Sequence, residues 1–151
     1  MAGNGGFRRI VVAFDGSKDS SKAVQVACTL AGKFAARVAV VHVYHSPATV
    51  FAPGPGMPLP NFADLEQAAE ESGRSVLAKG VEIASRAGVR ARGELMESPS
   101  AVEAIVTFAS EEGADLIVVG TRGMTGFKKL LLGSVSSGVV SHSRCPVLVV
   151  R

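Results

Sequence analysis

Continuous apolar runs that alternate with helical patterns constrain the fold of this chain more than any other feature. Strands buried on both faces read as unbroken apolar runs, and parallel strands are usually of that kind. Four such runs occur, at residues 9–14, 37–44, 116–119 and 146–150. A weaker run at 89–95 alternates apolar and charged residues, which predicts a half-exposed strand near the edge of a sheet.

Helical patterns fill the intervals between these runs. The first follows a cap at Asp19 or Ser20, and the second spans 63–87 and ends before Gly88. Ser98-Pro99 has the composition of an N-cap followed by a first helical residue. The last helical pattern covers about 135–143. The resulting β-α-β-α-β-α-β-α-β order predicts a parallel sheet with helices on both faces and right-handed crossovers.

The segment 45–61 interrupts this regular order. It holds five of the seven prolines, so we expect neither a helix nor a central strand in it. Because it leaves the carboxyl end of the second strand, it could overhang a ligand site. An unconstrained insertion is the alternative, and the sequence does not decide between the two.

Bulk composition limits the class of protein. The 151 residues fit one domain, with residues 1–8 expected as a flexible N-terminus. The charge of +3 is scattered, and one Tyr without any Trp argues against nucleic-acid binding. No apolar run approaches the roughly 18 residues of a membrane span, and no signal peptide is recognisable. With Cys28 and Cys145 read as apolar residues in a reducing compartment, we expect a cytoplasmic protein without membrane insertion.

A glycine-punctuated loop follows the apolar run at 116–119. Gly120 and Gly123 lie in this loop, and Gly133 and Ser134 precede the last helical pattern. Glycine lets the backbone approach an anion closely, and the free N–H groups of a helix N-terminus attract negative charge. The pattern therefore suggests a phosphate site. A long turn whose glycines only provide positive φ is the alternative.

Ligands of open parallel sheets bind at the carboxyl ends of the strands. Asp15 follows the first apolar run directly, where it could accept a hydrogen bond from a ribose hydroxyl, cap the following helix, or do both. The common nucleotide motifs, G-x-x-x-x-G-K-[ST] and a G-x-G-x-x-G after the first strand, do not occur. His42, His45 and His142 lack ligand spacing, so we expect no metal site made by side chains, although Mg²⁺ could arrive with phosphates.

In place of those motifs stands Gly120-x-x-Gly123, nine residues, and then Gly133-Ser134. This arrangement resembles the ATP-binding branch of the universal stress protein family, whose pattern is G-x-x-G, nine residues, and then Gly followed by Ser or Thr. The spacing matches at all four positions.

The resemblance extends beyond the loop. The run 12–17, with its Asp15, looks like the first strand of the family, His42-Val43 looks like the end of the second strand, and 145–150 looks like the last strand. It covers the chain from Arg9 onward, so residues 9–151 are identified as one universal stress protein domain.

The resemblance implies a set of nucleotide-binding residues: Ala13, Asp15, Val43, Gly120, Gly123, Gly133, Ser134 and Val135. Asp15 would contact the ribose or adenine, and the Val43 backbone would contact the adenine in a pocket lined by Ala13. The two loop glycines would let the chain wrap the ribose and first phosphates. The last three residues would hold phosphates at the start of the final helix.

The expected protein is thus an α/β protein with a Rossmann-like open five-stranded parallel sheet in the order 3-2-1-4-5. The resemblance implies a cytoplasmic, dimeric stress-response sensor or adaptor that binds ATP, or else AMP or ADP, and acts on an unknown protein partner. Its dimers would pair through the apolar strand Val147–Val150. We expect no enzyme, because neither a water-positioning base nor a Walker lysine is evident. A slow ATPase or self-phosphorylating protein, and an interaction module with an empty loop, are the alternatives.

Overall fold

The computed structural model describes residues 5–121 and 132–151. Strands and helices alternate along the chain as the sequence predicts, with one additional short helix. The elements are β1 (Arg9–Ala13), α1 (Lys18–Phe34), β2 (Arg37–Tyr44), α2 (Pro47–Val50), α3 (Phe62–Arg86), β3 (Arg92–Glu97), α4 (Ala101–Glu111), β4 (Leu116–Gly120), α5 (Ser134–His142) and β5 (Val147–Val150).

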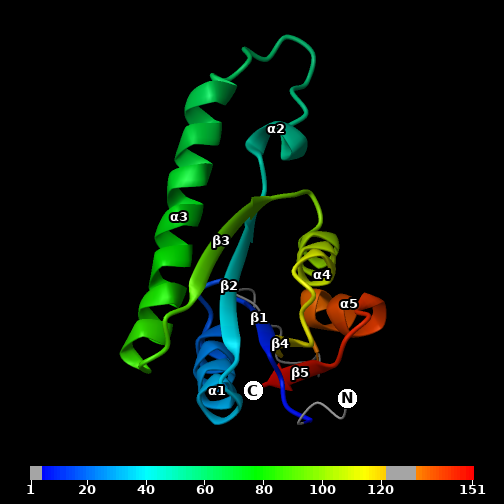
Figure 1. Cartoon of the computed structure of the whole chain (residues 1–151). Coiled ribbons are helices and arrows are strands. Elements are labelled where there is room, and N and C mark those ends of the chain that lie inside the picture. The colour runs from blue at the N-terminus through cyan, green and yellow to red at the C-terminus, as the bar shows by residue number, and fades with distance from the viewer. Residues whose placement is uncertain (1–4, 122–131) are drawn as a thin grey trace.

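The strands of the described chain form one parallel sheet of five strands in the order β3-β2-β1-β4-β5 (Figure 1). In the centre of the sheet, Ile10 pairs with Val38 on β2 and with Leu116 on β4. The predicted α/β class and the predicted strand order are therefore confirmed. The order reverses between β1 and β4, where open sheets of this kind bind ligands.

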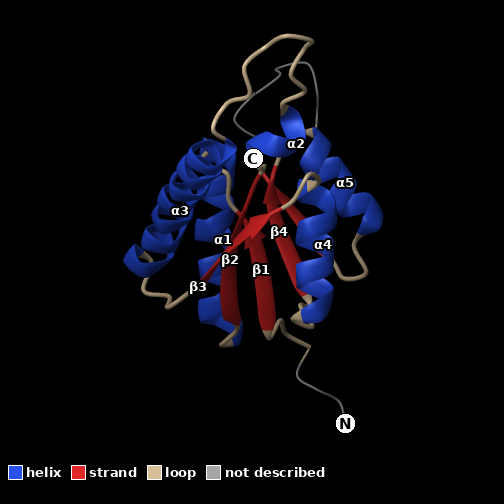
Figure 2. Ribbon diagram, turned by 90° about the horizontal axis from the view of Figure 1, so that it is seen from above, coloured by secondary structure: helices blue, strands red, loops and turns tan. Residues whose placement is uncertain are grey.

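Helices cover both faces of the sheet, α1 and α3 on one side and α4 and α5 on the other (Figure 2). Alternate residues of the central strands point into the two layers, which is why the apolar runs are unbroken. Val12 and Val40 face α1 and α3, whereas Val11 and Val41 face α4 and α5.

Helix α3 packs on the sheet through small residues. Its buried positions are Gly73, Gly80 and Ala84, whereas Leu65 is 41% exposed. A Cβ at Gly80 would stand only 2.7 Å from the Phe14 ring and 2.9 Å from Val40 Cγ1. At Gly80 the backbone of α3 therefore lies closer to the sheet than any residue with a Cβ would allow.

The predicted cap of α1 was wrong. Its N-cap is Ser17, whose hydroxyl accepts a hydrogen bond from the Ser20 amide at 3.2 Å. The helix is capped two or three residues earlier than predicted, because Asp15 and Ser17 already close a turn behind β1. Asp19 consequently lies inside the first turn of the helix.

The boundary between β3 and α4 also differs from the prediction. The strand begins at Arg92 and extends to Glu97, and the Ser98 amide still donates to the Tyr44 carbonyl of β2 at 3.1 Å. Ser98 is therefore held by the sheet, and the N-cap of α4 is Ser100, whose hydroxyl accepts from the Glu103 amide. The position of β3 at the edge of the sheet is confirmed.

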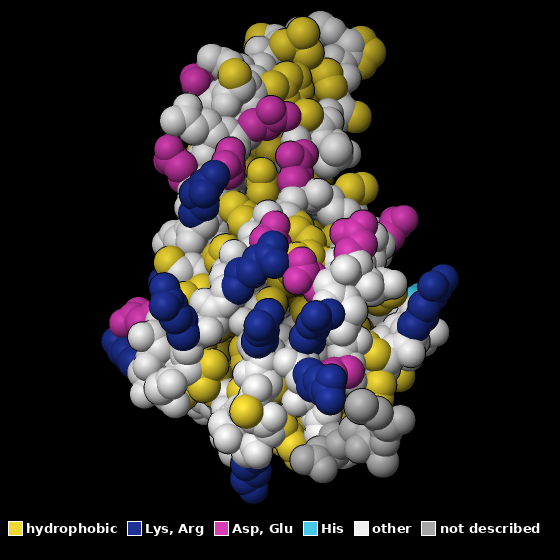
Figure 3. Space-filling model, viewed as in Figure 1, with side chains coloured by type: hydrophobic (Ala, Val, Ile, Leu, Met, Phe, Trp, Pro, Cys, Tyr) yellow, Lys and Arg dark blue, Asp and Glu magenta, His cyan; other side chains and the backbone are white. Residues whose placement is uncertain are grey.

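The prediction that 45–61 contains no helix was wrong by one short turn. Pro47 opens α2, where a missing backbone N–H costs no hydrogen bond. Beyond α2, large apolar side chains are exposed, among them Val50 at 76% and Leu59 at 72%. Figure 3 shows hydrophobic side chains gathered at this end of the molecule.

The chain already contacts the rest of the domain before β1 begins. The Phe7 ring meets Phe34 edge-on with 5.5 Å between centroids, and the Arg8 amide donates to Asp115 Oδ2 at 2.8 Å.

Cys28 and Cys145 are free thiols. Within residues 5–121 and 132–151, no helix is both long and apolar enough to cross a membrane.

Candidate functional site

The carboxyl ends of β1, β2 and β4 bring most of the predicted site residues to one edge of the sheet. The pair Ala13 and Val41 ends the register between β1 and β2, and Val12 pairs with Val118 of β4. Asp15 and Val43 thus leave neighbouring strands at the same edge, beside Gly120. Ala13 and Val43 are half-buried and pack on the core under α4 and α5.

The turn between β1 and α1 is held by its own polar side chains. Asp15 Oδ1 accepts a hydrogen bond from the Ser17 amide at 2.9 Å, and the Asp15 amide donates to Ser20 Oγ at 3.3 Å. His42 Nδ1 contacts the Phe14 carbonyl at 2.8 Å from β2. Among the residues described, Asp15 Oδ2 accepts no hydrogen bond, so this turn presents one carboxylate oxygen at the edge of the sheet.

Gly120 lies directly against the start of α1. A Cβ at this position would be 2.8 Å from the Asp19 carbonyl carbon and 2.9 Å from the Ser20 amide nitrogen. Both atoms belong to the backbone, so they could move only with the helix. Gly120 therefore lets the first turn of α1 approach β4, and this packing role is independent of any contact with a ligand.

Thr121 joins four elements at the same edge. Its amide donates to the Val150 carbonyl at 2.8 Å, which continues the pairing of β4 with β5. Its buried hydroxyl lies 2.9 Å from Asp19 Oδ2 on α1 and 3.0 Å from the Val150 carbonyl. Its carbonyl accepts from the Gly133 amide at 2.6 Å and from Ser136 Oγ at 3.1 Å, at the start of α5. The sequence analysis did not identify Thr121.

The N-terminus of α5 is open in the sense that no side chain of the described residues caps it. Gly133 is its N-cap and has no side chain with which to accept a hydrogen bond. Because the Gly133 amide already donates to Thr121, the amides of Ser134 and Val135 are the first that lack an acceptor within the helix. Ser134 and Val135 are exposed. This helix start has the geometry of an anion site.

Seven of the eight predicted site residues therefore lie at this edge or at the start of α5, and Gly123 lies outside the described residues. The sequence analysis assigned no role at this edge to the hydroxyl residues Thr121, Ser136 and Ser17. Their common signal is weak, since small hydroxyl residues next to strand ends and helix starts also occur in ordinary turns.

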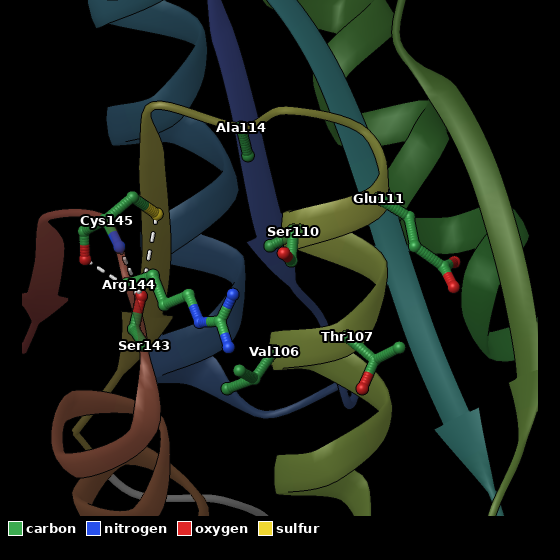
Figure 4. A pocket seen from close by; sticks show the side chains of 9 residues that line it. Val106, Thr107, Ser110, Glu111, Ala114, Ser143, Arg144 and Cys145 are labelled. Atoms are coloured by element: carbon green, nitrogen blue, oxygen red, sulfur yellow. Dashed lines mark hydrogen bonds between the residues drawn. The ribbon is translucent and has the colours of Figure 1, made fainter.

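A separate hollow of about 350 Å³ lies between the end of α4 and the chain leading into β5 (Figure 4). Its walls include Thr107, Ser110 and Arg144, and Ser143 Oγ donates to the Cys145 carbonyl at 2.8 Å beside it. The hollow is at the amino ends of β4 and β5. It is thus at the opposite edge of the sheet from Asp15 and α5.

The fold and this edge define an α/β protein in which a helix start with anion-binding geometry lies at the same edge as the carboxylate of Asp15. The family model for the universal stress protein family matches residues 6–151, and the chain belongs to that family. A universal stress protein of Methanocaldococcus jannaschii is 37% identical over 145 residues, which cover 96% of this chain and 82% of that protein.

Two solved structures are similar over nearly the whole chain. A universal stress protein in complex with cAMP is 27% identical, with a TM-score of 0.69, and the match covers 97% of this chain and 98% of that one. A universal stress protein of Archaeoglobus fulgidus in complex with dAMP is 25% identical, with a TM-score of 0.66, and the match covers 95% and 98%.

Proposed function

We propose that this protein binds an adenine nucleotide at the carboxyl edge of the sheet, with ATP as the first candidate and AMP or ADP as the second. The observation that carries the proposal is the open start of α5, which lies beside a strand end bearing Asp15. The two relatives solved with cAMP and dAMP support it, because these ligands share adenine, a sugar and a phosphate with ATP.

The described groups divide between the parts of such a ligand. The amides of Ser134 and Val135 and the Ser134 hydroxyl would bind phosphate oxygens, and any Mg²⁺ would accompany those phosphates. Asp15 Oδ2 would accept from a ribose hydroxyl, since the other carboxylate oxygen already binds the Ser17 amide. The Val43 backbone and Ala13 would contact the adenine.

Calorimetric titration with ATP, ADP and AMP tests the proposal. A hydrogen bond to a charged group contributes about 1.5–3 kcal/mol, so Ser134→Ala should weaken binding by about 10- to 100-fold. Ser141→Ala is the matched control, because this exposed serine lies on the same helix and donates to the Ser137 carbonyl. Folded protein that binds none of the three nucleotides at millimolar concentration would refute the proposal.

We propose further that the protein is a cytoplasmic stress-response sensor or adaptor that holds its nucleotide without turning it over. At the described edge, the hydroxyls of Ser17, Ser20, Thr121 and Ser136 are all engaged with neighbouring protein groups, which leaves Asp15 Oδ2 for a ligand. Single-turnover assays with labelled ATP check this. Phosphate release that Ser134→Ala suppresses would instead establish a slow ATPase, and label retained on the protein would establish self-phosphorylation.

The protein is also proposed to form homodimers through the edge strand β5. The Ile117 amide donates to the Pro146 carbonyl and the Thr121 amide to the Val150 carbonyl, so Val149 directs its backbone groups away from β4. Val149→Pro removes that outward N–H and should give a monomer in analytical ultracentrifugation. Val149→Ala keeps the N–H and should remain dimeric, and two variants with the same mass would contradict this interface.

A further inference from the structure

The edge strand β3, at the other end of the strand order from β5, has features of a second binding surface. β3 pairs with β2 on one side only, and it is the outermost strand (Figure 1). The Ser98 amide donates to the Tyr44 carbonyl of β2, so the backbone groups of the alternate residues Gly93, Leu95 and Glu97 point outward. Gly93 and Glu97 are exposed. The outward row of N–H and C=O groups is therefore accessible to another strand.

The groove on the α3 side of this edge is mostly apolar. Gly93 and Leu95 form its floor, and one stripe of α3 that includes Leu77, Ala78 and Val81 forms its wall. Ala78 is exposed. An apolar side chain that projects from an added strand on this side would be removed from water.

The groove on the α4 side of the same edge is acidic. Among the described residues its lining contains no Lys or Arg, and the carboxylates that face it are Glu94 of β3 and Glu103 and Glu111 of α4. Arg92 forms ion pairs with Glu94 and Glu112, each at 3.0 Å. Within the described parts of the chain, Glu103 and Glu111 have no ion pair. Met96 and Phe108 provide apolar surface beneath them.

We propose that β3 is the docking edge for an extended segment of a partner protein in which apolar residues alternate with Lys or Arg. Such a segment would add a sixth strand, with one set of side chains in the apolar groove and the other in the acidic groove. Main-chain hydrogen bonds provide affinity in this mode, and the alternating side chains provide specificity. A second copy of this chain fits less well, because two acidic grooves would be brought together.

This edge and the proposed dimer edge are at opposite ends of the strand order, so both can be occupied in one assembly. Since β3 has six residues, a peptide of about eight residues in an extended conformation would cover it. The acidic groove favours a protein segment over anionic lipid or nucleic acid, because its negative charge would repel both of these.

Fluorescence anisotropy with a labelled octapeptide of alternating Val and Lys tests the proposal. We expect saturable binding that weakens with salt. A control octapeptide of alternating Val and Glu should bind at least about tenfold more weakly. N-methylation of alternate residues removes donors on one edge of the peptide, so one of the two possible N-methylated versions should lose binding. Equal binding of all these peptides would overturn the proposal.

Paired variants separate the two grooves from general charge effects. Glu103→Gln with Glu111→Gln should weaken Val and Lys peptide binding by about tenfold or more. The matched control, Asp64→Asn with Glu71→Gln, removes two exposed carboxylates of α3 outside the grooves and should leave binding unchanged. Equal loss in both double variants would indicate only non-specific attraction and would overturn the docking edge.

The apolar groove is tested from the surface of α3, where substitutions preserve the fold. Ala78→Arg introduces a bulky cation into the groove and should abolish binding, whereas Ala68→Arg on the same helix should not. Sedimentation without peptide would detect pairing of this edge with a second copy. A self-association that Ala78→Arg abolishes would replace the partner segment with another copy of this chain.

Discussion

Two glycine-to-alanine substitutions in helices should change stability in opposite directions. In a helix interior, alanine is favoured over glycine by about 1 kcal/mol, so propensity alone predicts that both substitutions stabilise the protein. Gly32 lies in α1 with no atom within 4 Å of an added Cβ, and it should follow propensity. Gly80 lies in α3 with Phe14 at 2.7 Å and Val40 at 2.9 Å from an added Cβ.

The neighbours of Gly80 cannot yield easily. Phe14 is 3% exposed and Val40 is 0% exposed, and both belong to the core between the sheet and α1 and α3. Overpacking a core costs about 1–3 kcal/mol, and contacts below 3 Å place Gly80→Ala toward the upper part of that range. After the gain of about 1 kcal/mol from propensity, Gly80→Ala should destabilise the protein by about 1–2 kcal/mol.

Urea unfolding followed by far-ultraviolet circular dichroism measures both effects. We expect Gly32→Ala to raise the free energy of unfolding by about 0.5–1 kcal/mol and Gly80→Ala to lower it, with similar slopes against urea. The reasoning would be refuted if Gly80→Ala matched or exceeded the stability of the original chain. That result would mean that α3 lies farther from β1 and β2 than the structure has it.

Three further substitutions or reactions test other local features. Thr121→Val should cost about 1–3 kcal/mol of unfolding free energy, because it removes the buried hydroxyl that binds neighbouring elements, and Thr121→Ser should cost less; equal losses in urea unfolding would contradict this role. Burial, and then the nearby negative charge of Glu97, raises the pKa of Tyr44 above the ordinary value of about 10. Since Tyr44 is the only tyrosine and the chain has no Trp, its ultraviolet absorbance titration should have a raised midpoint, which Glu97→Gln should lower. Burial also raises the pKa of the Cys28 thiol, so mass spectrometry should find that iodoacetamide alkylates Cys145 first in the folded protein.

The fold could be predicted well because its central strands are buried on both faces. Such strands have no polar alternation, and the apolar run 37–44 coincides with β2 at both ends. The edge strand β3 was displaced by three residues at its start, because a half-exposed strand tolerates polar residues and its boundary has no sharp compositional signal. Ser98-Pro99 added to the error, since the pair resembles a helix start while the sheet still binds the Ser98 amide.

Site residues with a local sequence signal could be predicted, whereas those that depend on long-range contacts could not. Asp15 and the glycines could be predicted because an acidic residue behind an apolar strand and a glycine before a helix are local signals. Thr121 could not, because its importance depends on Asp19, which is 102 positions away in the sequence and binds the Thr121 hydroxyl at 2.9 Å.

The same contact explains why the cap of α1 was misplaced. Asp is a residue type that often caps helices, yet Ser17 is the cap of α1. The Asp19 carboxylate instead accepts a hydrogen bond from the Thr121 hydroxyl. That hydrogen bond joins the start of α1 to the end of β4, where Gly120 permits the close approach. A local pattern can identify a residue that is able to cap a helix, but only the packed sheet decides which candidate does so. The position of Asp19 is therefore a consequence of the tertiary fold, and its exchange with Ser17 as the cap would require β4 and α1 to separate.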